Sequence, residues 1–513
     1  MNTYLQGYDQ HLRNKLYQGF LYGFPIFSSY RNNIVPSYTN HRSALDNPIV
    51  VQSKIDKELC LGRIAGPFNS PPLPSMIISP LGLVPKKASA EWRLIHDLSF
   101  PKESSVNSNI EPYFTRVQYQ DLDHCISIIS SLGQGTLIAK ADLKDAFRIL
   151  PIHPSAHRLL GFSWNEQYYY DKHLPMGCSL SCQLFETLST AVQWILQNKL
   201  GVDHMSHILD DFMFFSPPGS KKCKLYLDTF IHLADSLNLP IKHTKTVLPT
   251  TCVSLHGIEV DTAAMSIRLP LDKLKDAQRK VTAMSKRKKT SLSELQSLLG
   301  TLNFACKVIV PGRAFLRRLF DLTKGLVKKD HWIRLTRAAR LDLQAWAVFL
   351  TSFNGRVLCL PNAWTSSSSI KLYSDASGAA FAAVFGSTWL QGTFPGKWRH
   401  SNIAIKELLP IVLAVRLWAK ELSNQRILFF CDNQAIVYVI NKQSSKEPTI
   451  MALIRTLVSV TLNYNIHFMA KHIPGKKNVI ADLLSRSQVT KALQVAPWLD
   501  KTPVAFPPQW LPW

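Results

Sequence analysis

The chain has 513 residues, of which 46% are hydrophobic and 18% are charged, so it can fill extensive cores and is not a disordered protein. Lysine and arginine together number 59 against 35 aspartates and glutamates, which gives a formal net charge of +24. A surplus of this size favours a polyanionic partner, most simply nucleic acid, because basic side chains neutralise phosphates and release counterions. The length predicts about two to four domains.

The cysteines and the lengths of the apolar runs indicate in which cellular compartment the protein is expected. Nine cysteines are scattered without the spacing of a zinc site, which predicts reduced thiols. The N-terminus lacks a basic segment followed by an apolar one, and no run of about 18 apolar residues occurs. We therefore expect an intracellular protein, cytoplasmic or nuclear, with no membrane partner.

The N-terminal part of the chain offers few signals. The first 44 or so residues have no clear hydrophobic period, so no element is predicted there. Asn47 followed by Pro48 predicts a helix that begins at an N-cap asparagine and continues through Leu61. Extended segments punctuated by proline follow, and they end at the paired lysines Lys86 and Lys87.

A predicted strand over residues 92–98 places a third cation, Arg93, close in sequence to Lys86 and Lys87. Two ammonium groups and one guanidinium fork could bind a triphosphate. Three solvated charges at a basic edge would also be unremarkable. The residues alone leave these two interpretations equally open.

Residues 136–143 form a β-prone run that ends in Asp142. A charge at the end of a mostly buried strand is expensive unless a cation neutralises it. A metal ion would supply that cation. The loop with Met176 and Gly177 then leads into a predicted helix from about Cys182 to Leu200, and a glycine at such a helix start can let a nucleotide approach the backbone.

Asp210 and Asp211 lie between two apolar runs, which predicts a β-hairpin with the acids at its turn. Aspartate pairs are common in turns because the side chain bonds its own backbone there, so this pair alone says little. Together with Asp142, however, the pair has the form of a two-metal site, in which carboxylates from separate strands hold two divalent ions about 4 Å apart.

Further along, residues 285–289 form a basic run that is either a nuclear address or a solvated loop. Ser291 with Glu294 predicts a capping box that opens a helix through Ile309. A Pro-Gly pair breaks that helix, and residues 314–327 resume it. The resumed helix carries the adjacent arginines Arg317 and Arg318.

A Ser/Thr-rich linker over residues 365–369 predicts a domain boundary. After it we expect two strands over residues 370–385, a helix from about 403 to 422, a strand over 426–433 and a last helix following His472. These elements carry Asp375, Glu407, Asp432 and Asp482 respectively. The four acids could surround two magnesium ions, although Glu407 and Asp482 taken singly have the character of solvated helix charges.

The order of the first set of motifs resembles that of reverse transcriptases. It consists of the basic cluster, Asp142-x-x-Asp145-Ala146-Phe147, Pro175-x-Gly177, the Asp-Asp hairpin, Lys245 and Leu255-His256-Gly257. The resemblance implies an α/β (α+β) right-hand polymerase with fingers, palm and thumb, joined by a connection to a ribonuclease H-like domain. Two positions depart from the family pattern: Ile208 stands where Tyr is usual, and Met176 where Gln is usual.

The resemblance also implies roles for the residues. Asp142, Asp210 and Asp211 would be the metal carboxylates, and Lys86, Lys87 and Arg93 would surround the triphosphate, with Met176 and Gly177 as further substrate-binding residues. Phe147 would exclude a ribose 2′-hydroxyl, Lys245 would lie near the pyrophosphate, and residues 255–258 near the primer. Arg317 and Arg318 would belong to a thumb that follows a duplex backbone; a plain amphipathic hairpin is the alternative.

The second set of acids, with the ending His-x-Pro-Gly-x-x-Asn-x-x-Ala-Asp-x-Leu-Ser-Arg, resembles ribonuclease H of retroelements. The resemblance implies Asp375, Glu407, Asp432 and Asp482 as metal ligands and His472 as a histidine for product release or proton transfer, unless Pro474-Gly475 holds it in a different loop. The amino-acid sequences of several stretches resemble DIRS-type retrotransposons most, with gypsy-type elements next. These stretches are residues 62–68, 79–87, 302–306 and 311–313.

The resulting hypothesis is an RNA-directed DNA polymerase with ribonuclease H that serves retrotransposon replication. It would use Mg²⁺, with Mn²⁺ as an alternative, together with dNTPs, an RNA template, a DNA primer and an RNA–DNA hybrid. An inactive, domesticated nucleic-acid-binding scaffold and a polymerase with an inactive nuclease are the alternatives.

The expected domains follow from the same resemblance. They are an N-terminal extension (1–59), fingers and palm (60–265), thumb-like helices (266–330), a connection (331–369), a ribonuclease H-like domain (370–486) and a Pro/Trp-rich tail (487–513). The tail either docks on the protein or belongs to a longer polyprotein.

Overall fold

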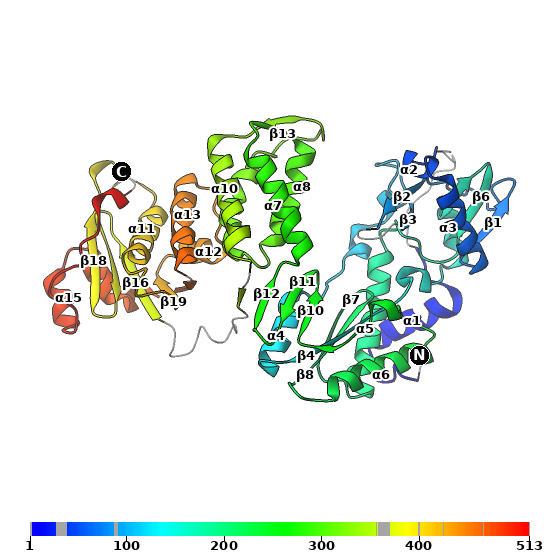
Figure 1. Cartoon of the computed structure of the whole chain (residues 1–513), viewed down its shortest axis with the longest axis horizontal. Coiled ribbons are helices and arrows are strands. Elements are labelled where there is room, and N and C mark those ends of the chain that lie inside the picture. Colours follow the sequence, from blue (N-terminus) through cyan, green and yellow to red (C-terminus); the bar gives the residue numbers. More distant parts are fainter. Residues whose placement is uncertain are drawn as a thin grey trace. The chain divides into compact units, whose positions relative to one another are not determined.

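The computed structural model describes residues 3–26, 38–86, 91–354, 356–357, 370–398, 401–423, 425–464 and 466–511. The chain folds into two compact units. The first contains Met1–His256 and Asp261–Ala264, and the second contains Gly257–Val260 and Met265–Trp513. Many elements of both units are labelled in Figure 1. Among the described helices, none is long and apolar enough to cross a membrane.

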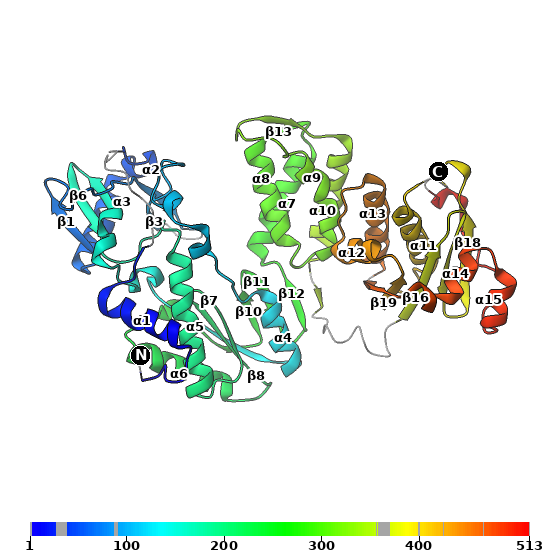
Figure 2. The same ribbon diagram turned by 180° about the vertical axis from the view of Figure 1, so that it is seen from behind.

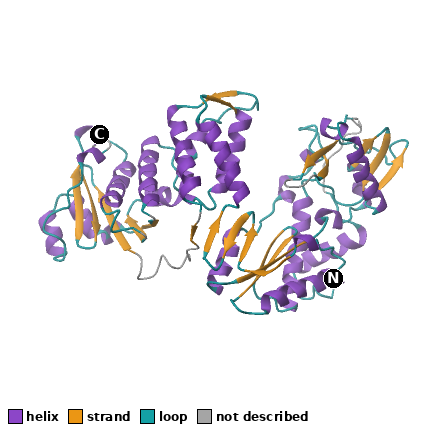
Figure 3. Ribbon diagram, viewed as in Figure 1, coloured by secondary structure: helices purple, strands orange, loops and turns teal. Residues whose placement is uncertain are grey.

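The first unit is centred on a four-stranded sheet in the order β7-β8-β4-β9. Its strands are β7 (Met205–Ile208), β8 (Asp211–Ser216), β4 (Leu137–Asp142) and β9 (Val247–Thr250). The predicted strand and the predicted hairpin are therefore confirmed. Helices α5 (Ser181–Lys199) and α6 (Lys222–Ser236) pack against these strands, and Figure 3 shows both beside the sheet. The apolar side chains of β8 are buried on both faces, and each contributes about 1.5–3 kcal/mol of transfer free energy.

The described residues before position 60 form helices that belong to the first unit. Helix α1 (Gln10–Tyr22) is N-capped by Asp9, whose side chain accepts from the Leu12 N–H, and it lies along α5. No periodic apolar pattern marked this helix, because the chain buries only a narrow stripe of it. Helix α3 (Pro48–Cys60) follows the short α2 (Arg42–Leu45) and begins with Pro48 after Asn47, as predicted, but it ends one residue before Leu61.

Two smaller sheets complete the first unit. One has the order β1-β6-β5, with β1 (Ile64–Phe68), β6 (Gln167–Asp171) and β5 (Gly161–Trp164), and the other is the hairpin of β2 (Leu81–Pro85) and β3 (Trp92–His96). Their apolar faces share one core with α3, which contains Val51, Ile55 and Trp164. Helix α4 (Leu122–Leu132) and strand β10 (Cys252–Leu255) are the remaining helix and strand of this unit.

The second unit begins with a helical part. It contains α7 (Leu271–Ser285), α8 (Leu292–Ala305), α9 (Arg317–Asp321) and α10 (Arg337–Ser352), with the paired strands β13 (Lys289–Ser291) and β14 (Trp332–Arg334). The predicted capping box of Ser291 and Glu294 is present. Short strands lie nearby: β11 (Ile258–Asp261), β12 (Ser266–Arg268) and β15 (Arg356–Val357).

Two helix lengths in this part differ from the prediction. Helix α8 ends at Ala305 rather than Ile309, and the residues expected to continue as one long helix form a 3-10 turn and the five-residue α9. In the 3-10 turn, a Cβ at Gly312 would lie 2.4 Å from the Trp346 ring, so the backbone here passes close to a buried tryptophan on α10.

The rest of the second unit contains a five-stranded sheet in the order β18-β17-β16-β19-β20. Strands β16 (Ile370–Ala376), β17 (Ala380–Phe385) and β18 (Thr388–Thr393) are antiparallel, whereas β19 (Arg426–Cys431) and β20 (His467–His472) run parallel to β16. The helices are α11 (Ile403–Leu417), α12 (Gln434–Lys442), α13 (Pro448–Asn463), α14 (Val479–Ser485) and α15 (Val489–Val495). Helix α11 ends at Leu417, five residues before the expected Leu422.

The C-terminal segment docks on this sheet. Helix α15, visible in Figure 2, packs with Ala492 and Ala496 against Trp389 and the apolar face of β17. The indole N–H of Trp389 donates to the Asp500 carbonyl oxygen at 2.8 Å, and the guanidinium of Arg416 lies 4.3 Å from the Trp510 ring centroid. Of the two alternatives for residues 487–513, docking on the protein is therefore observed for the described residues.

Candidate active sites

The three acids predicted for the first site converge on one edge of the four-stranded sheet. Asp142 ends β4 and is paired in register with Asp211, the first residue of β8. Asp210 lies in the turn just before it, and its carbonyl oxygen accepts from the Leu143 N–H at 3.0 Å. Side chains more than 60 residues apart in sequence are thus brought together by an antiparallel pairing.

Burial and mutual repulsion perturb these carboxyl groups. Burial, followed by the charges of Asp142 and Asp211, raises the pKa of Asp210 to about 6. Burial also raises the pKa of Asp142, although the Lys245 ammonium 2.6 Å away opposes the shift. Asp211 has its own cation, because its Oδ2 lies 2.9 Å from the Nζ of Lys140. The first site therefore contains two lysines that partly neutralise its acids.

Side chains of α5 hold the turn that carries Asp210 in place. Leu209 has a φ of 50°, a left-handed conformation unusual for a leucine. Its N–H donates to Glu186 Oε2 at 2.9 Å, and its carbonyl oxygen accepts from the Ser189 hydroxyl at 2.8 Å. The other oxygen of Glu186 lies 3.2 Å from His207 Nε2. Sequence reasoning missed Glu186; its signal was an acid within the buried stripe of an apolar helix.

Two loops predicted to contact substrate flank these acids in sequence. Phe147 is half-buried, and its ring centroid lies 5.9 Å from that of Phe185 on α5. Gly177 has a φ of 126°, and a Cβ there would lie 1.9 Å from the His96 carbonyl oxygen, so only glycine fits. Asn107, another missed residue, fastens this loop, since its amide donates to the Gly177 carbonyl oxygen at 2.7 Å. Met176 is 37% exposed.

The basic cluster lies on the β2–β3 hairpin. Arg93 on β3 is exposed, and Lys86 follows β2, where its Nζ lies 2.5 Å from Glu91 Oε2. Lys87 lies outside the described residues. An exposed guanidinium and a lysine with a single exposed carboxylate partner can be redirected to a phosphate, so both remain candidates for a triphosphate contact.

The predicted thumb arginines do not point freely to solvent. Arg317 pairs with Asp321 at 3.2 Å, and Arg318 lies 3.4 Å from Asp342 on α10 while donating to the Ala338 carbonyl oxygen at 2.9 Å. The interpretation of this pair as part of a thumb stays a prediction. The basic run 286–289 is exposed, which fits both a nuclear address and a solvated loop.

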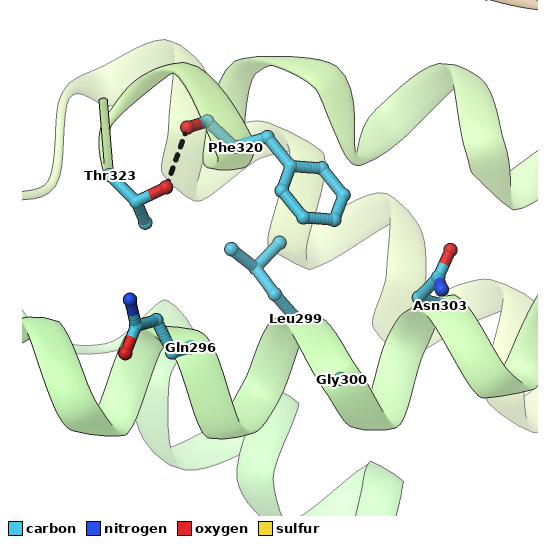
Figure 4. A pocket seen from close by; sticks show the side chains of 6 residues that line it. All are labelled: Gln296, Leu299, Gly300, Asn303, Phe320 and Thr323. Carbon is cyan, nitrogen blue, oxygen red and sulfur yellow. Dashed lines mark hydrogen bonds between the residues drawn. The ribbon is translucent and has the colours of Figure 1, made fainter. Parts of the chain in front are cut away.

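An open groove of about 330 Å³ lies between α8 and α9. Figure 4 shows Phe320 lying over Leu299, with Gln296, Gly300 and Asn303 along α8. The hydroxyl of Thr323 is used locally, because it donates to the Phe320 carbonyl oxygen at 2.8 Å. The groove is uncharged, so a ligand there would be recognised by amide hydrogen bonds and shape rather than by ion pairs.

The acids predicted for the second site also come together. Asp375 lies on β16, Asp432 follows β19 beside it, and Glu407 reaches in from the first half of α11. One ligand atom each from Glu407, Cys431 and Asp432 lie within 4.8 Å of one another. Glu407 is only 4% exposed, so the alternative interpretation of this residue as a solvated helix charge is wrong.

The largest pKa shift at the second site, that of Glu407, exceeds the shift of Asp210 at the first. Burial, followed by the charges of Asp375 and Asp432, raises the pKa of Glu407 to about 9. Burial raises the pKa of Asp375 to about 6, even though the Ser485 hydroxyl donates to it at 2.5 Å. Burial also raises the pKa of the adjacent Cys431 thiol, and Mg²⁺ prefers oxygen ligands to sulfur, so the carboxylates are the better candidates to hold it.

Asp482 and His472 complete the predicted second site. Asp482 lies in the first turn of α14, and Arg486 Nε donates to it at 2.8 Å. Asn478 fixes the start of this helix, since its amide donates to the Ser374 carbonyl oxygen at 2.9 Å. His472 ends β20 and is exposed, with its Nε2 3.1 Å from the Asp432 carbonyl oxygen. It therefore lies beside the acids, where a mobile histidine could act.

Both clusters fit divalent cations. Their donors are carboxylate oxygens, which Mg²⁺ prefers, and each cluster draws them from separate elements. Carboxyl groups whose pKa values are raised to about 6 or 9 by burial and by one another gain most from a bound cation. The raised pKa values are thus a physical argument for metal binding that is independent of the motifs.

Comparison with known proteins gives a family match for part of the chain. Residues 84–281 match the family described as "Reverse transcriptase (RNA-dependent DNA polymerase)". The matched range includes the three acids, Phe147, Gly177 and Lys245. This part of the chain is therefore similar to reverse transcriptases.

The homologues are polyproteins of viruses and transposons. Over 390 residues the chain is 24% identical to the genome polyprotein of Petunia vein clearing virus (isolate Shepherd), covering 72% of the chain and 17% of the relative. It is 23% identical over 464 residues to the retrovirus-related Pol polyprotein from transposon opus of Drosophila melanogaster, covering 85% of the chain and 42% of the relative. The chain thus spans less than half the length of these relatives.

Solved structures show the same fold. The foamy viral protease-reverse transcriptase dRH in complex with dsDNA is similar with a TM-score of 0.53 and 18% identity, covering 87% of this chain and 73% of that one. The foamy viral protease-reverse transcriptase in complex with dsDNA has a TM-score of 0.51 and 17% identity, covering 86% of each chain. The expected mixed α/β class is confirmed.

Proposed function

We propose that the chain is an RNA-directed DNA polymerase of a retroelement that also cleaves the RNA strand of RNA–DNA hybrids. The observation that carries the polymerase part is the convergence of Asp142, Asp210 and Asp211 on one sheet edge inside the range that matches the reverse transcriptase family. The net charge of +24 supports a nucleic-acid partner that is held through phosphates.

Mg²⁺ or Mn²⁺ ions, when held by these three carboxylates, would supply activation of the primer 3′-hydroxyl and stabilisation of the leaving oxygen. The chain's own residues position the reactants. Lys86, Lys87 and Arg93 bind the triphosphate, and Phe147 occupies the space that a ribose 2′-hydroxyl would need. Lys245, whose Nζ lies 2.6 Å from Asp142, would be the residue that binds the pyrophosphate.

The nuclease part of the proposal is supported by the second cluster. Asp375, Glu407, Asp432 and Asp482 would hold metal ions that activate water, and His472 would assist proton transfer or product release. Foamy viral protease-reverse transcriptase has been solved with dsDNA and with an RNA/DNA hybrid, and we propose the same classes of ligand for this chain, with a primed RNA or DNA template and dNTPs as substrates.

Finer assignments belong to the same proposal. We infer a DIRS-type retrotransposon as the source, with a gypsy-type element next, and a cytoplasmic or nuclear site of action. The proposed parts are fingers and palm over 60–265, thumb-like helices over 266–330, a connection over 331–369 and a ribonuclease H-like domain over 370–486. The packing of α1, α3 and α15 extends the functional units beyond the ends of these ranges.

Two single substitutions test both activities in the full chain. On a poly(rA) template with a DNA primer, the unaltered protein should extend the primer only with a divalent metal, and Asp210→Asn should not. On labelled RNA–DNA hybrid, the unaltered protein should cleave the RNA, and Asp432→Asn should not. Each variant is the folding control for the other, because it should retain the activity of the remaining site.

The outcomes separate the alternatives. No metal-dependent synthesis by the unaltered protein would favour a catalytically inactive nucleic-acid-binding scaffold. Synthesis together with equal cleavage by the unaltered protein and Asp432→Asn would refute the proposed nuclease site, and synthesis without any cleavage would indicate an idle nuclease.

A further inference from the structure

A chain of alternating charges runs through the interior of the first unit, away from the metal carboxylates. Its members are three acids, two arginines and one histidine: Glu58, Arg63, His96, Asp145, Arg148 and Asp171. They come from α3, from the residue before β1, from β3, from the turn after β4, and from β6. No motif that predicted the polymerase site includes Arg148, Glu58 or Asp171.

Arg148 is the centre of this network. Its Nε donates to Glu58 Oε2 at 3.0 Å, and its Nη1 donates to Asp171 Oδ1 at 2.5 Å and to the His173 carbonyl oxygen at 3.1 Å. The side chain is 14% exposed and that of Asp171 is 4% exposed. The planar guanidinium thus holds two acids and a carbonyl group in directions that a single ammonium could not satisfy together.

One end of the network fixes the turn that carries Phe147. Asp145 has a φ of 54° and precedes the short 3-10 helix Ala146–Ile149. Its carboxylate lies 3.2 Å from Arg63, which in turn lies 3.7 Å from Glu58. A left-handed aspartate is a strained position that persists only where its surroundings hold it. Arg148 itself follows Phe147 directly, so both sides of this turn are tied to the network.

The other end fixes the loop that carries Met176 and Gly177. Asp171 Oδ2 lies 2.8 Å from His96 Nδ1, and His96 Nε2 lies 3.0 Å from the Gly161 carbonyl oxygen. Both ring nitrogens of His96 therefore have a partner in the interior. The backbone N–H of His96 donates to the Met176 carbonyl oxygen at 3.1 Å, and its own carbonyl oxygen occupies the space beside Gly177.

We propose that Arg148 is a positioning residue for nucleotide selection, which joins the Phe147 turn and the Met176–Gly177 loop into one rigid wall of the nucleotide site. Buried ion pairs are often no more stabilising than apolar side chains of the same volume, so stability alone is a weak reason for so many buried charges. Fixing two loops relative to each other is a role that apolar packing performs less specifically. The inference rests on the proposed polymerase function.

The test compares variants that change the network with one that does not. Arg148→Lys keeps the positive charge but loses the planar guanidinium group. Glu58→Gln removes one carboxylate of the network, and Arg148→Gln removes the positive charge at its centre. The matched control is Asp56→Asn, which removes an exposed acid of the same helix that accepts from the Gln52 amide at 2.8 Å. All are made in the full chain.

Hydrogen exchange measures the positioning without any activity. We expect exchange at residues 143–150 and 174–180 to become at least about threefold faster in Arg148→Lys and Glu58→Gln, while the rest of the first unit and Asp56→Asn stay unchanged. Unchanged exchange in both segments, or an equal increase throughout the unit, would overturn the proposal.

Steady-state primer extension then measures selection. Arg148→Lys should raise KM for dNTP about tenfold with a smaller effect on kcat, and should reduce the preference for dNTP over rNTP by a similar factor. A fall in kcat alone, with KM and the preference unchanged, would show a merely structural role and overturn the inference. If the unaltered chain extends no primer, the proposed function fails, and the exchange result still decides whether the network holds the two loops together.

Discussion

The two carboxylate clusters of this protein are built from similar ligands but differ in the cations around them. At the first, Lys245 and Lys140 lie within 3 Å of Asp142 and Asp211, and the pKa of Asp210 is raised to about 6. At the second, the basic partner described is Arg486 on Asp482, and the pKa of Glu407 is raised to about 9. Lysine ammonium groups thus oppose the repulsion between the acids of the first cluster, whereas Glu407 in the second must either lie near a bound cation or take up a proton at neutral pH.

The largest effect is expected from neutralising Glu407. In metal-free protein at pH 7, the carboxyl group of Glu407 must take up a proton on folding, which costs free energy. Glu407→Gln should therefore stabilise the folded chain by on the order of 3 kcal/mol. The same substitution should lower cleavage of the hybrid by more than about a hundredfold. Calorimetry in EDTA and a cleavage assay measure the two effects. The control is Glu421→Gln, an exposed acid of the same unit. A Glu407→Gln protein less stable than the unaltered one would contradict this account.

The pH dependence of stability should differ between the clusters. A carboxyl group whose pKa is higher in the folded than in the unfolded state binds more protons when folded, so stability falls as pH rises between the two values. Glu407 should therefore cost stability progressively from about pH 4.5 to about pH 9, and Asp210 only up to about pH 6. Calorimetric midpoints of metal-free protein across this range, with Glu407→Gln as the reference, measure the difference. Parallel curves for the two proteins would exclude the assigned shift.

Removing a lysine should make the first cluster behave like the second. Lys245→Met deprives Asp142 of its partner, so the pKa of Asp142 should rise further and primer extension should fall about tenfold, with the acidic limb of the pH–rate profile moved to higher pH. Hybrid cleavage should not change. The matched control, Lys222→Met, breaks an exposed 3.2 Å pair with Asp203 in the same unit. Equal losses in both variants would argue against a specific role for Lys245.

The smallest effect should come from Glu186, which supports the first cluster without touching its acids. Glu186→Gln keeps an acceptor for the Leu209 N–H but removes the charge near His207, so we expect about a threefold loss of primer extension and about 1 kcal/mol of stability. Primer extension and calorimetry are the measurements, with the exposed Glu103→Gln as the control. A loss as large as that of Asp210→Asn would mean that Glu186 does more than hold the turn.

Local patterns in the sequence were sufficient for many of the elements. The Ser291–Glu294 capping box and the Asp-Asp hairpin form as predicted, because each depends on contacts within a few residues. Helix α3 also begins at Pro48 as predicted, although Asn47 makes no side-chain cap hydrogen bond. The strand ending in Asp142 forms as predicted too, but its partners β8 and β9 lie far along the chain. Local patterns did not give the end of α8 at Ala305 or the pairing of Arg318 with Asp342.

The sequence by itself determined which side chains are candidates to bind metal and nucleotide, since residue type and motif order need no knowledge of the fold. Only the tertiary structure decided which charges are neutralised. Strand register brings Asp142 to Asp211, a distant 3-10 turn supplies Lys245, and the buried ion pairs of Arg148 join α3 to β6. The reason is physical: Coulomb interactions and burial depend on distance and solvent exposure in space, and neither can be inferred from spacing along a chain when the partners are many residues apart.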